Sequence, residues 1–380
     1  MPNTPTDKPG DKPVPQSAVI GDLQFENLHE VVRKARQNLS QNEWDYIVGA
    51  TESETTLKRN RMAIDSMAFR PRVLRDVSRI DTSVEQFGRR LRLPVMLAPV
   101  GSLESFYEGG GATSSRAAQA FGIAHMLSSV CKPGLEEVAE AAPDGTRIFQ
   151  LYVRGDADWV DDHVRRAIDN GYKAFCITVD TAQISRRERD LAKRFRPVGR
   201  RQVSGRDFQA GLDWKTVERV KRKFDIPLIL KGIATAEDAR IALEHKVDWI
   251  YVSNHGGRQL DHGLGSFAVL PEIVETVGGR AKIMVDGGFY RGTDIVKAIA
   301  AGAHIVGLGR LQCYGLAAGG VPAIVRMLEL LEDEIVRCLS LLGVTSFAEV
   351  DKSYLVPAPP VTMPNVFSAF PLLEIEPYRY

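Results

Sequence analysis

Eight short apolar runs recur along this 380-residue chain, and segments with helical periodicity separate most of them. Each run has four to seven residues, largely Val, Ile, Leu, Met and Ala, which is typical of parallel strands buried on both faces. Eight strand–helix units predict an α/β protein with a parallel sheet, and they favour a closed (β/α)8 TIM barrel. A doubly wound open sheet remains the alternative, because periodicity alone does not show closure. The runs lie at residues 94–99, 123–128, 147–153, 174–179, 228–231, 249–253, 282–286 and 304–308.

Helix-start and helix-stop residues stand between these runs. Gly171 follows an apolar face with i, i+4, i+7 spacing and is placed to end a helix. Thr235 precedes an acidic residue three positions on, which predicts a helix cap. Thr293 predicts a second cap, for a helix that carries Ile295 and Ile299.

The chain divides into three parts by composition. Residues 1–21 are rich in Pro, Asp, Lys and Thr and lack the apolar core of a signal peptide, which predicts a disordered tail. Residues 22–355 form the predicted domain, in which a helical N-terminal extension precedes the barrel. Residues 356–380 form a Pro-rich C-terminal extension that cannot be one long helix. Its aromatic residues suggest that it packs on something, such as a neighbouring subunit.

Charge and cysteine usage narrow the function classes. The net charge of +1 argues against a general nucleic-acid or membrane-surface role. The four cysteines include no C-x-x-C pair, which favours free thiols over a disulfide framework or a zinc site. No apolar stretch approaches the length of a membrane span. We therefore expect a soluble cytoplasmic protein without a metal site.

Charged and polar residues gather where the predicted strands end. Active sites in this fold lie at the C-terminal ends of the strands, so these residues are candidates for chemistry. Lys, His, Arg and Asp all converge on one rim, which packing alone does not explain. The segments are Thr178–Asp180, Lys231–Gly232, Ser253–Arg258, Asp286–Gly288 and Gly307–Arg310.

The last two of these segments predict a phosphate site. Paired glycines let the backbone approach an anion closely, and Arg310 adds a guanidinium fork. Loops after the seventh and eighth strands are the usual phosphate position in this fold. The third glycine of a dinucleotide motif is missing, and the chain has no P-loop, so a mononucleotide phosphate is the expected ligand.

His255 and Arg258 form the candidate chemical centre. An imidazole near neutral pH can take the proton of a substrate hydroxyl, and a guanidinium can hold a carboxylate. Asp180 is placed to orient the histidine, although a helix cap is an alternative role. A buried Lys231 requires an anionic partner, which reduced flavin would supply. Arg187 lies in a charged run and could equally belong to a solvated face.

The run Ser253–Asp261, SNHGGRQLD, resembles the FMN-dependent 2-hydroxy-acid oxidase and dehydrogenase family, which includes glycolate oxidase, L-lactate dehydrogenase and mandelate dehydrogenase. The resemblance covers roughly residues 24–355. Supporting matches are Ala98–Pro99, Phe149–Tyr152, Thr178–Thr181, Arg186–Arg187, Asp286–Gly288 and Arg291–Asp294.

The resemblance implies FMN at the C-terminal mouth of the barrel. His255 would be the base, paired with Asp180. Arg187 and Arg258 would bind the substrate carboxylate, helped by Tyr46 and Tyr152. Lys231 would lie near flavin N1 and O2. The other residues around the flavin would be Pro99, Val100, Gly101, Ser128, Gln150, Thr178 and Ser253, and those at the ribityl phosphate Asp286, Gly287, Gly288, Gly309 and Arg310.

The implied reaction is oxidation of an (S)-2-hydroxy acid to the 2-oxo acid. Oxygen, a quinone or a soluble carrier would reoxidise the flavin. Transfer as a hydride or through a carbanion stays open. The resemblance also implies a homo-oligomer, either a tetramer or an octamer.

This chain departs from the family pattern at several positions. Tyr290 replaces an arginine that helps to bind the FMN phosphate in many members. Gly101 and Ser102 replace an alanine and a methionine of typical members, which should alter the space around flavin and substrate, and Ser102 and Val130 suggest room for a substrate side chain larger than methyl. The loop at about residues 196–211 is short and basic.

Two other functions stay open. Related flavin barrels act on prenyl diphosphates, and isomerase activity would identify that class. The aromatic C-terminal extension also permits a flavoprotein used as a scaffold or peptide-modifying partner.

Overall fold

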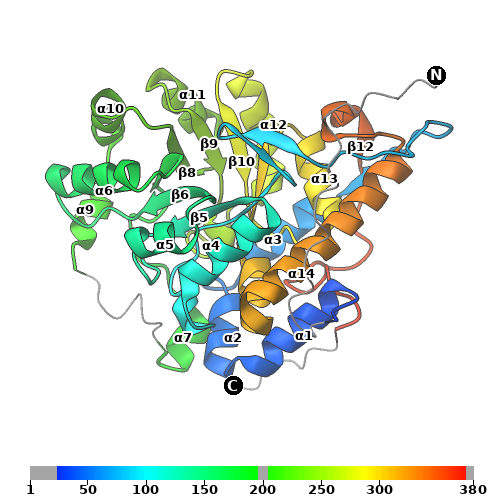
Figure 1. Cartoon of the computed structure of the whole chain (residues 1–380), viewed down its shortest axis with the longest axis horizontal. Coiled ribbons are helices and arrows are strands. Elements are labelled where there is room, and N and C mark those ends of the chain that lie inside the picture. Colours follow the sequence, from blue (N-terminus) through cyan, green and yellow to red (C-terminus); the bar gives the residue numbers. More distant parts are fainter. Residues whose placement is uncertain (1–23, 196–203, 374–380) are drawn as a thin grey trace, which may run out of the picture.

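Eight parallel strands close into a barrel in this computed structural model, which describes residues 24–195 and 204–373. The strands pair in chain order, and the last pairs with the first (Figure 1). This confirms the TIM barrel and excludes the doubly wound sheet. Each strand coincides with one predicted run. They are β4 (Val95–Leu97), β5 (Ala124–Ser128), β6 (Thr146–Leu151), β7 (Ala174–Thr178), β8 (Leu228–Ile233), β9 (Trp249–Val252), β10 (Lys282–Val285) and β11 (Ile305–Leu308).

The barrel has two core layers because side chains alternate along each strand. One set points inward and forms a separate interior cluster that includes Met96, Met126, Tyr251 and Met284. The other set packs outward against the helices, in the larger core. The strands are therefore apolar on both faces.

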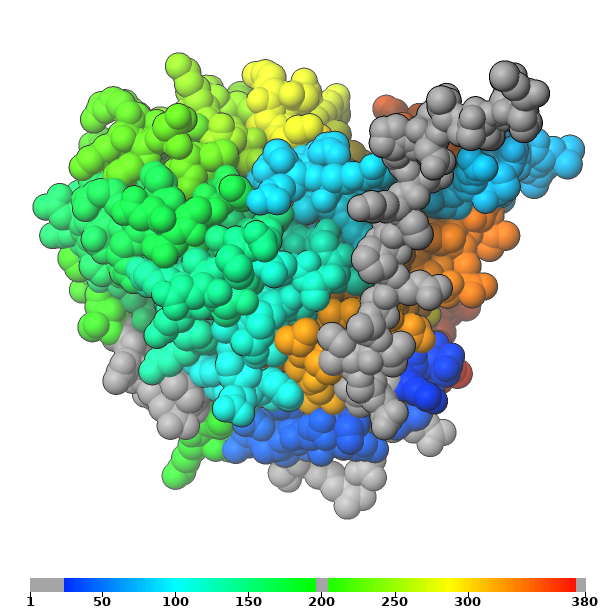
Figure 2. All heavy atoms as spheres, in the orientation of Figure 1, coloured from blue at the N-terminus to red at the C-terminus, as the bar shows by residue number. Residues whose placement is uncertain are grey.

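Helices follow the barrel strands along the chain. Figure 2 shows one face of the molecule, much of which is covered by residues of the cyan-to-green part of the chain. The Thr235 cap is confirmed, since its side chain accepts from the Asp238 N–H. The Thr293 cap is wrong: the helix begins at Gly292, and the Asp294 carboxylate takes the cap by accepting from the Arg291 N–H. The helices are α4 (Gly110–Phe121), α5 (Leu135–Ala141), α6 (Ala157–Asp169), α10 (Trp214–Lys223), α11 (Ala236–Glu244), α12 (Ser266–Val277), α13 (Gly292–Ala300) and α14 (Arg310–Leu342).

The N-terminal extension is helical, as predicted, and carries residues to both ends of the barrel. A hairpin closes the end opposite the strand C-termini, where Phe87 stacks on Trp249 with ring centroids 4.7 Å apart. At the other end, the last turn of the second helix brings Tyr46 to the mouth, and the carbonyl of Gly49, the next residue after that helix, accepts from Arg258. The elements are α1 (Leu28–Asn38), α2 (Gln41–Val48), α3 (Thr55–Asp65), β1 (Met67–Phe69), β2 (Val84–Gln86) and β3 (Arg89–Leu91).

The C-terminal extension packs on its own chain. After β12 (Leu355–Pro357), which pairs with β1, the chain crosses the outer surface of the helices. Phe367 stacks on Trp44, and Phe370, 1% exposed, contacts His29 and Tyr290. The aromatic residues of the extension that the structure describes, Phe367 and Phe370, thus have partners within one subunit. The predicted tail at residues 1–21 lies outside the described residues.

Helix α14 is the only helix in residues 24–195 and 204–373 that is long and apolar enough to cross a membrane. However, 67% of its most apolar segment is buried inside the protein, where it packs on α1, α4 and α13. It has the character of a core helix.

Candidate active site

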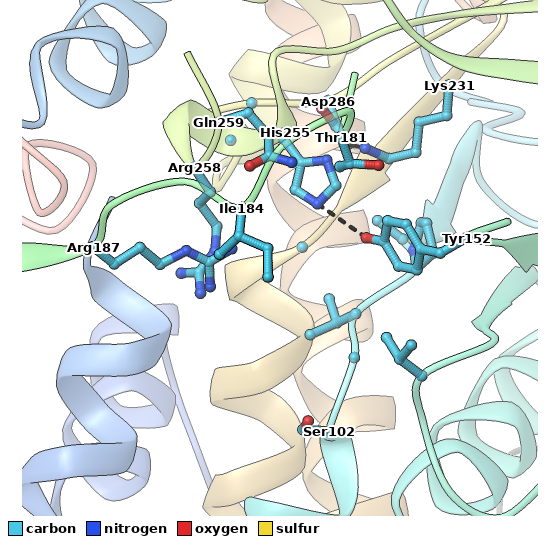
Figure 3. Close-up of a pocket in the computed structure, with 18 of the residues that line it drawn as sticks. Ser102, Tyr152, Thr181, Ile184, Arg187, Lys231, His255, Arg258, Gln259 and Asp286 are labelled. Atoms are coloured by element: carbon cyan, nitrogen blue, oxygen red, sulfur yellow. Dashed lines mark hydrogen bonds and ion pairs between the residues drawn. The ribbon is translucent and has the colours of Figure 1, made fainter. Parts of the chain in front are cut away.

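A cavity of about 330 Å³ opens at the C-terminal ends of the barrel strands. Its wall comes from the segments after β4, β5, β6, β7, β9, β10 and β11, from Lys231 on β8, and from the end of α2. Figure 3 shows side chains from these separate segments pointing into one space. The barrel thus brings together residues that are far apart in sequence.

His255 and Asp180 form a hydrogen-bonded pair at the cavity. His255 Nδ1 lies 3.0 Å from Asp180 Oδ1, and its Nε2 lies 3.1 Å from the Tyr152 hydroxyl (Figure 3). Gly232 makes the pairing possible, because a Cβ there would lie 2.6 Å from Asp180 Cβ. With Nδ1–H donating to the carboxylate, Nε2 keeps its lone pair toward the cavity.

The protonation states of this pair suit a base. Burial lowers the pKa of His255, and Asp180 opposes this only in part, so the imidazole is neutral at neutral pH. Burial alone would raise the pKa of the Asp180 carboxyl, but His255 and Lys231 more than offset it and keep the pKa below its usual value. A neutral base therefore lies against a fixed negative charge.

Lys231 lies at the end of β8 in a buried polar chain. Its Nζ donates to Ser253 Oγ at 2.9 Å, and Ser253 Oγ donates to Asp286 Oδ1 at 2.6 Å. Burial acts to lower the pKa of Lys231, yet Asp286 and Asp180 raise it above its usual value. The anionic partner that a buried lysine requires is therefore supplied within the protein by Asp286, 3.6 Å away.

Two arginines face the cavity near His255. Arg187 is 6% exposed, whereas the side chain of its neighbour Arg186 is 68% exposed, so Arg187 is the member of the charged run that turns inward. Arg258 Nη1 donates to the carbonyls of Tyr46 at 2.6 Å and Gly49 at 3.0 Å. Both guanidiniums lie over the Tyr46 ring, at 5.6 and 4.6 Å from its centroid.

The loops after β10 and β11 form the glycine-rich end of the cavity. Gly287 and Gly288 have φ of +103° and +89°, which side chains rarely adopt, and a Cβ on Gly309 would meet nothing within 4 Å. Arg310 is held by backbone carbonyls: it donates to Ile47, Gly256 and Gly49 at 2.9–3.0 Å.

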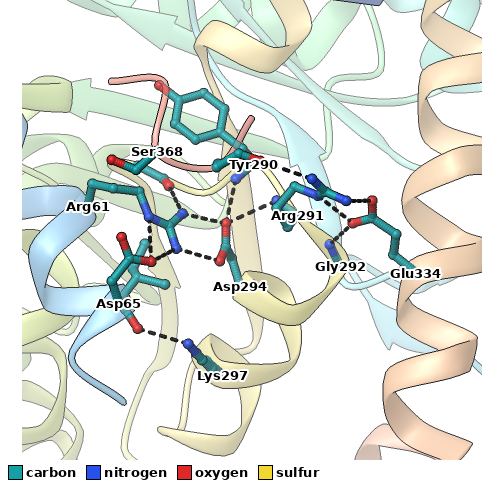
Figure 4. A network of polar contacts seen from close by, with 12 residues as sticks. Arg61, Asp65, Tyr290, Arg291, Gly292, Asp294, Lys297, Glu334 and Ser368 are labelled. Carbon is teal, nitrogen blue, oxygen red and sulfur yellow. Dashed lines mark hydrogen bonds and ion pairs between the residues drawn. The ribbon is translucent and has the colours of Figure 1, made fainter. Parts of the chain in front are cut away.

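A buried ion pair fixes the loop that carries these glycines. Arg61 on α3 donates to both carboxylate oxygens of Asp294, at 2.7 and 2.9 Å, and to the Gly288 carbonyl at 2.9 Å (Figure 4). Asp294 also accepts from the Tyr290 N–H at 2.9 Å. Tyr290 is buried, and its side chain lines the cavity beside Arg310.

Polar atoms without partners lie behind the wall. The amide O and N of Gln150 and the hydroxyl of Thr178 are buried and have no hydrogen-bond partner in the described structure. Buried polar groups are normally satisfied, so these atoms fit the polar edge of a flavin ring. Together with the open space at Gly309, they show that the residues present suit FMN.

The predicted site residues form two groups, those that line the cavity and those that are buried behind its wall. Those behind the wall are Ser128, Gln150, Thr178, Asp180 and Ser253. Those on the wall are Tyr46, Pro99, Val100, Gly101, Tyr152, Arg187, Lys231, His255, Arg258, Asp286, Gly287, Gly288, Gly309 and Arg310. No group of three His, Cys, Asp or Glu residues that could hold a metal occurs in the described ranges.

Sequence reasoning missed several wall residues, among them Phe106, Arg154, Ile184 and Arg206. Arg154 could have been found, because it lies two residues after the predicted site residue Tyr152, just beyond the end of the same strand. Val130 fills space beside Gly101, since a Cβ on Gly101 would lie 2.7 Å from Val130 Cγ2.

Comparison with known proteins agrees with this geometry. Residues 35–357 match the family model of the FMN-dependent dehydrogenases. Glycolate oxidase 3 of Arabidopsis thaliana is 37% identical over 355 residues, covering 88% of this chain and 96% of the relative. Glycolate oxidase of Spinacia oleracea is 35% identical, with 88% and 96% coverage.

Solved structures give the same result. The crystal structure of mandelate oxidase with (S)-2-phenylpropionate superposes with a TM-score of 0.82 at 36% identity, covering 89% of this chain and 100% of that chain. The matched region contains the barrel and all the site residues described above. The chain belongs to the FMN-dependent dehydrogenase family, and its cofactor is FMN.

Proposed function

We propose that this enzyme oxidises an (S)-2-hydroxy acid to the corresponding 2-oxo acid. One arrangement carries the proposal: a neutral imidazole, His255, backed by Asp180, faces the same cavity as Arg187 and Arg258. Oxidation of a 2-hydroxy acid requires a base that takes the hydroxyl proton and a group, such as a guanidinium, that binds the carboxylate. The glycolate and mandelate oxidases named above support it, since both names denote oxidation of 2-hydroxy acids.

The arginines would bind the substrate carboxylate. Arg258 is fixed by the carbonyls of Tyr46 and Gly49, and it lines the cavity. Arg187 lies over the same Tyr46 ring from the segment after β7. Two preorganised cations place the carboxylate, and with it the carbinol carbon, beside His255.

His255 would take the hydroxyl proton at Nε2. The proton turns the imidazole into a cation, which Asp180 stabilises at 3.0 Å. The Tyr152 hydroxyl, 3.1 Å from the same nitrogen, would help to hold the substrate oxygen in line. Bound FMN would supply the acceptor for the two electrons that leave the carbinol carbon as it becomes the carbonyl carbon, while the hydroxyl oxygen gives its proton to His255.

The chain offers a place for each end of the cofactor. Gln150, Thr178 and the charged Lys231 would hold the polar edge of the ring. Gly288 and Gly309 would accept the phosphate against backbone N–H groups, with Arg310 nearby.

Anaerobic mixing of the purified FMN enzyme with glycolate, (S)-lactate, (S)-mandelate and longer analogues tests the proposal. We expect flavin bleaching with at least one acid, and then recovery of the absorbance with oxygen, a quinone or a soluble carrier. No bleaching with any acid would contradict the proposal. His255→Ala should retain FMN and lose about a hundredfold or more in reduction rate.

A further inference from the structure

Two arginines line the cavity in addition to Arg187 and Arg258. Arg154 follows β6, and Arg206 begins the short helix α9 (Arg206–Ala210). Neither is needed to hold the carboxylate or the proton of a simple 2-hydroxy acid. Three observations show that the fold places them together at the mouth.

Arg154 lines the cavity two residues after Tyr152, just beyond the end of β6. The Tyr152 hydroxyl reaches His255 at 3.1 Å. In Figure 3, Tyr152 lies on one side of His255 and Arg187 and Arg258 on the other. The segment that carries Arg154 thus enters the cavity wall on the Tyr152 side of His255.

Arg206 is brought to Arg154 by close backbone packing. Gly205 has φ of +72°, and a Cβ there would lie 2.2 Å from the Arg154 carbonyl oxygen. Only glycine allows helix α9 to begin directly against the backbone of Arg154. The first residue of the helix is therefore a neighbour of Arg154.

A buried glutamine then fixes the orientation of α9. Gln209 Oε1 accepts from the Val153 N–H at 2.7 Å, and its Nε2 donates to the Thr178 carbonyl at 2.9 Å. Arg206 is three residues before Gln209, so both lie on the same face of the helix. The glutamine that joins the ends of β6 and β7 thus turns Arg206 toward the cavity.

The Arg154 and Arg206 guanidiniums lie close enough for their charges to interact. Partial burial lowers the pKa of the Arg154 guanidinium, the Tyr152 phenol opposes this, and the Arg206 charge lowers it further. Asp207 also lines the mouth and is exposed, as Arg206 is, but adjacent helix residues do not face each other. A carboxylate between Arg154 and Arg206 would be attracted by both guanidiniums.

We propose that the substrate carries a second anionic group, and that it is a 2-hydroxy dicarboxylic acid whose distal carboxylate binds Arg154 and Arg206. This inference rests on the proposed function. Arg187 and Arg258 hold the carboxylate beside the reacting carbon, and Arg154 and Arg206 hold the far one. The distance between the two pairs sets the chain length.

Matched substrates test the charge. Each 2-hydroxy dicarboxylate of four, five and six carbons is compared with two partners. One is the methyl-ended 2-hydroxy acid of equal carbon number, and the other is the monoamide in which only the distal carboxylate is replaced by a neutral amide. The measurement is the rate of anaerobic flavin reduction against substrate concentration, which does not depend on the second acceptor. We expect at least about a tenfold advantage for one dicarboxylate over both partners, weakened by salt.

Substitutions test whether Arg154 and Arg206 cause the rate advantage of the dicarboxylate. Arg154→Gln and Arg206→Gln should each bring the dicarboxylate-to-methyl ratio toward one. Arg165→Gln is the matched control, because it removes the same charge from an exposed position on α6 and should leave the ratio unchanged. Perturbation of the flavin spectrum by glutarate and by valerate gives a binding constant without turnover, and should follow the same order.

The outcomes separate the two proposals. Reduction by methyl-ended acids as efficiently as by dicarboxylates overturns this inference and leaves the proposed function intact. A dicarboxylate preference that survives in both arginine variants also overturns it. Absence of reduction by every acid contradicts the proposed function itself.

Discussion

The Tyr290 ring packs against Phe370 with ring centroids 5.4 Å apart and planes inclined by 63°. Arg291 adds a hydrogen bond of 2.9 Å to the Ala369 carbonyl. The C-terminal extension thus contacts Tyr290, the residue that replaces the phosphate-binding arginine expected from the family pattern. A segment outside the barrel supports the glycine-rich end of the cavity.

Phe370→Ala should therefore weaken both folding and FMN binding. Removing a buried phenylalanine costs about 3–5 kcal/mol and frees the Tyr290 ring. Urea unfolding and FMN titration measure the two effects. Leu372→Ala, at a side chain 69% exposed in the same segment, should stay within about 0.5 kcal/mol of the parent. Equal effects of the two changes would contradict the prediction.

Gly307→Ala should destabilise the barrel through one contact. A Cβ there would lie 2.2 Å from the Tyr251 hydroxyl oxygen, inside the barrel core. We expect a loss of about 1–3 kcal/mol in unfolding free energy. Tyr251→Phe removes that oxygen and should restore much of the loss in the double variant. Simple additivity in the double-mutant cycle would show that the two residues do not conflict.

The pH profile reports on His255 and Asp180. Burial keeps the pKa of His255 below its usual value of 6.5, so kcat/KM should be flat at neutral pH and fall only in acid, as the base becomes protonated. Asp180→Asn removes a charge that raises this pKa. Its acid limb should move to lower pH while its maximum falls about a hundredfold. An acid limb that moved upward would exclude the pairing.

Adjacent arginines should differ sharply in effect. Arg187→Lys replaces a planar fork in the cavity and should lower kcat/KM by about tenfold to a hundredfold, mainly through KM. Arg186→Lys changes an exposed side chain and should leave both constants unaltered. Steady-state kinetics on one good substrate suffices. Similar losses in the two variants would place neither arginine specifically at the carboxylate.

Asp294→Asn should cost up to about 3–5 kcal/mol, because the buried Arg61 loses one of its two carboxylate partners and keeps only Asp65. Burial acts to raise the pKa of Asp294, but Arg61 holds it below the usual 3.8. The stability that this pair contributes is therefore complete above pH 3.8 and lost as the pH falls through the lowered value. Unfolding measured from pH 7 to acid should show a shallower decline in the variant than in the parent.

The barrel was predictable because each strand is apolar on both faces, a property that the local sequence displays. The His255 segment was predictable because its motif is contiguous. Arg187 was not separable from Arg186 without the family pattern, since the local sequence does not show which one turns inward. Arg206 could not be predicted from the sequence. Gly205 and Gln209 position it through contacts with Arg154 and Val153, which lie more than fifty residues earlier in the chain. The predicted Thr293 cap was wrong because the Asp294 carboxylate, which Arg61 holds in place, caps the helix instead.

Arg258 and Arg310 share the carbonyl oxygens of Ile47 and Gly49. One comes from the loop after β9 and the other from the start of α14, yet both hold the C-terminal end of α2 and the residue that follows it. If a ligand at one end of the cavity shifts this segment, it displaces both guanidiniums. The affinities for cofactor and substrate would then alter each other to the same degree.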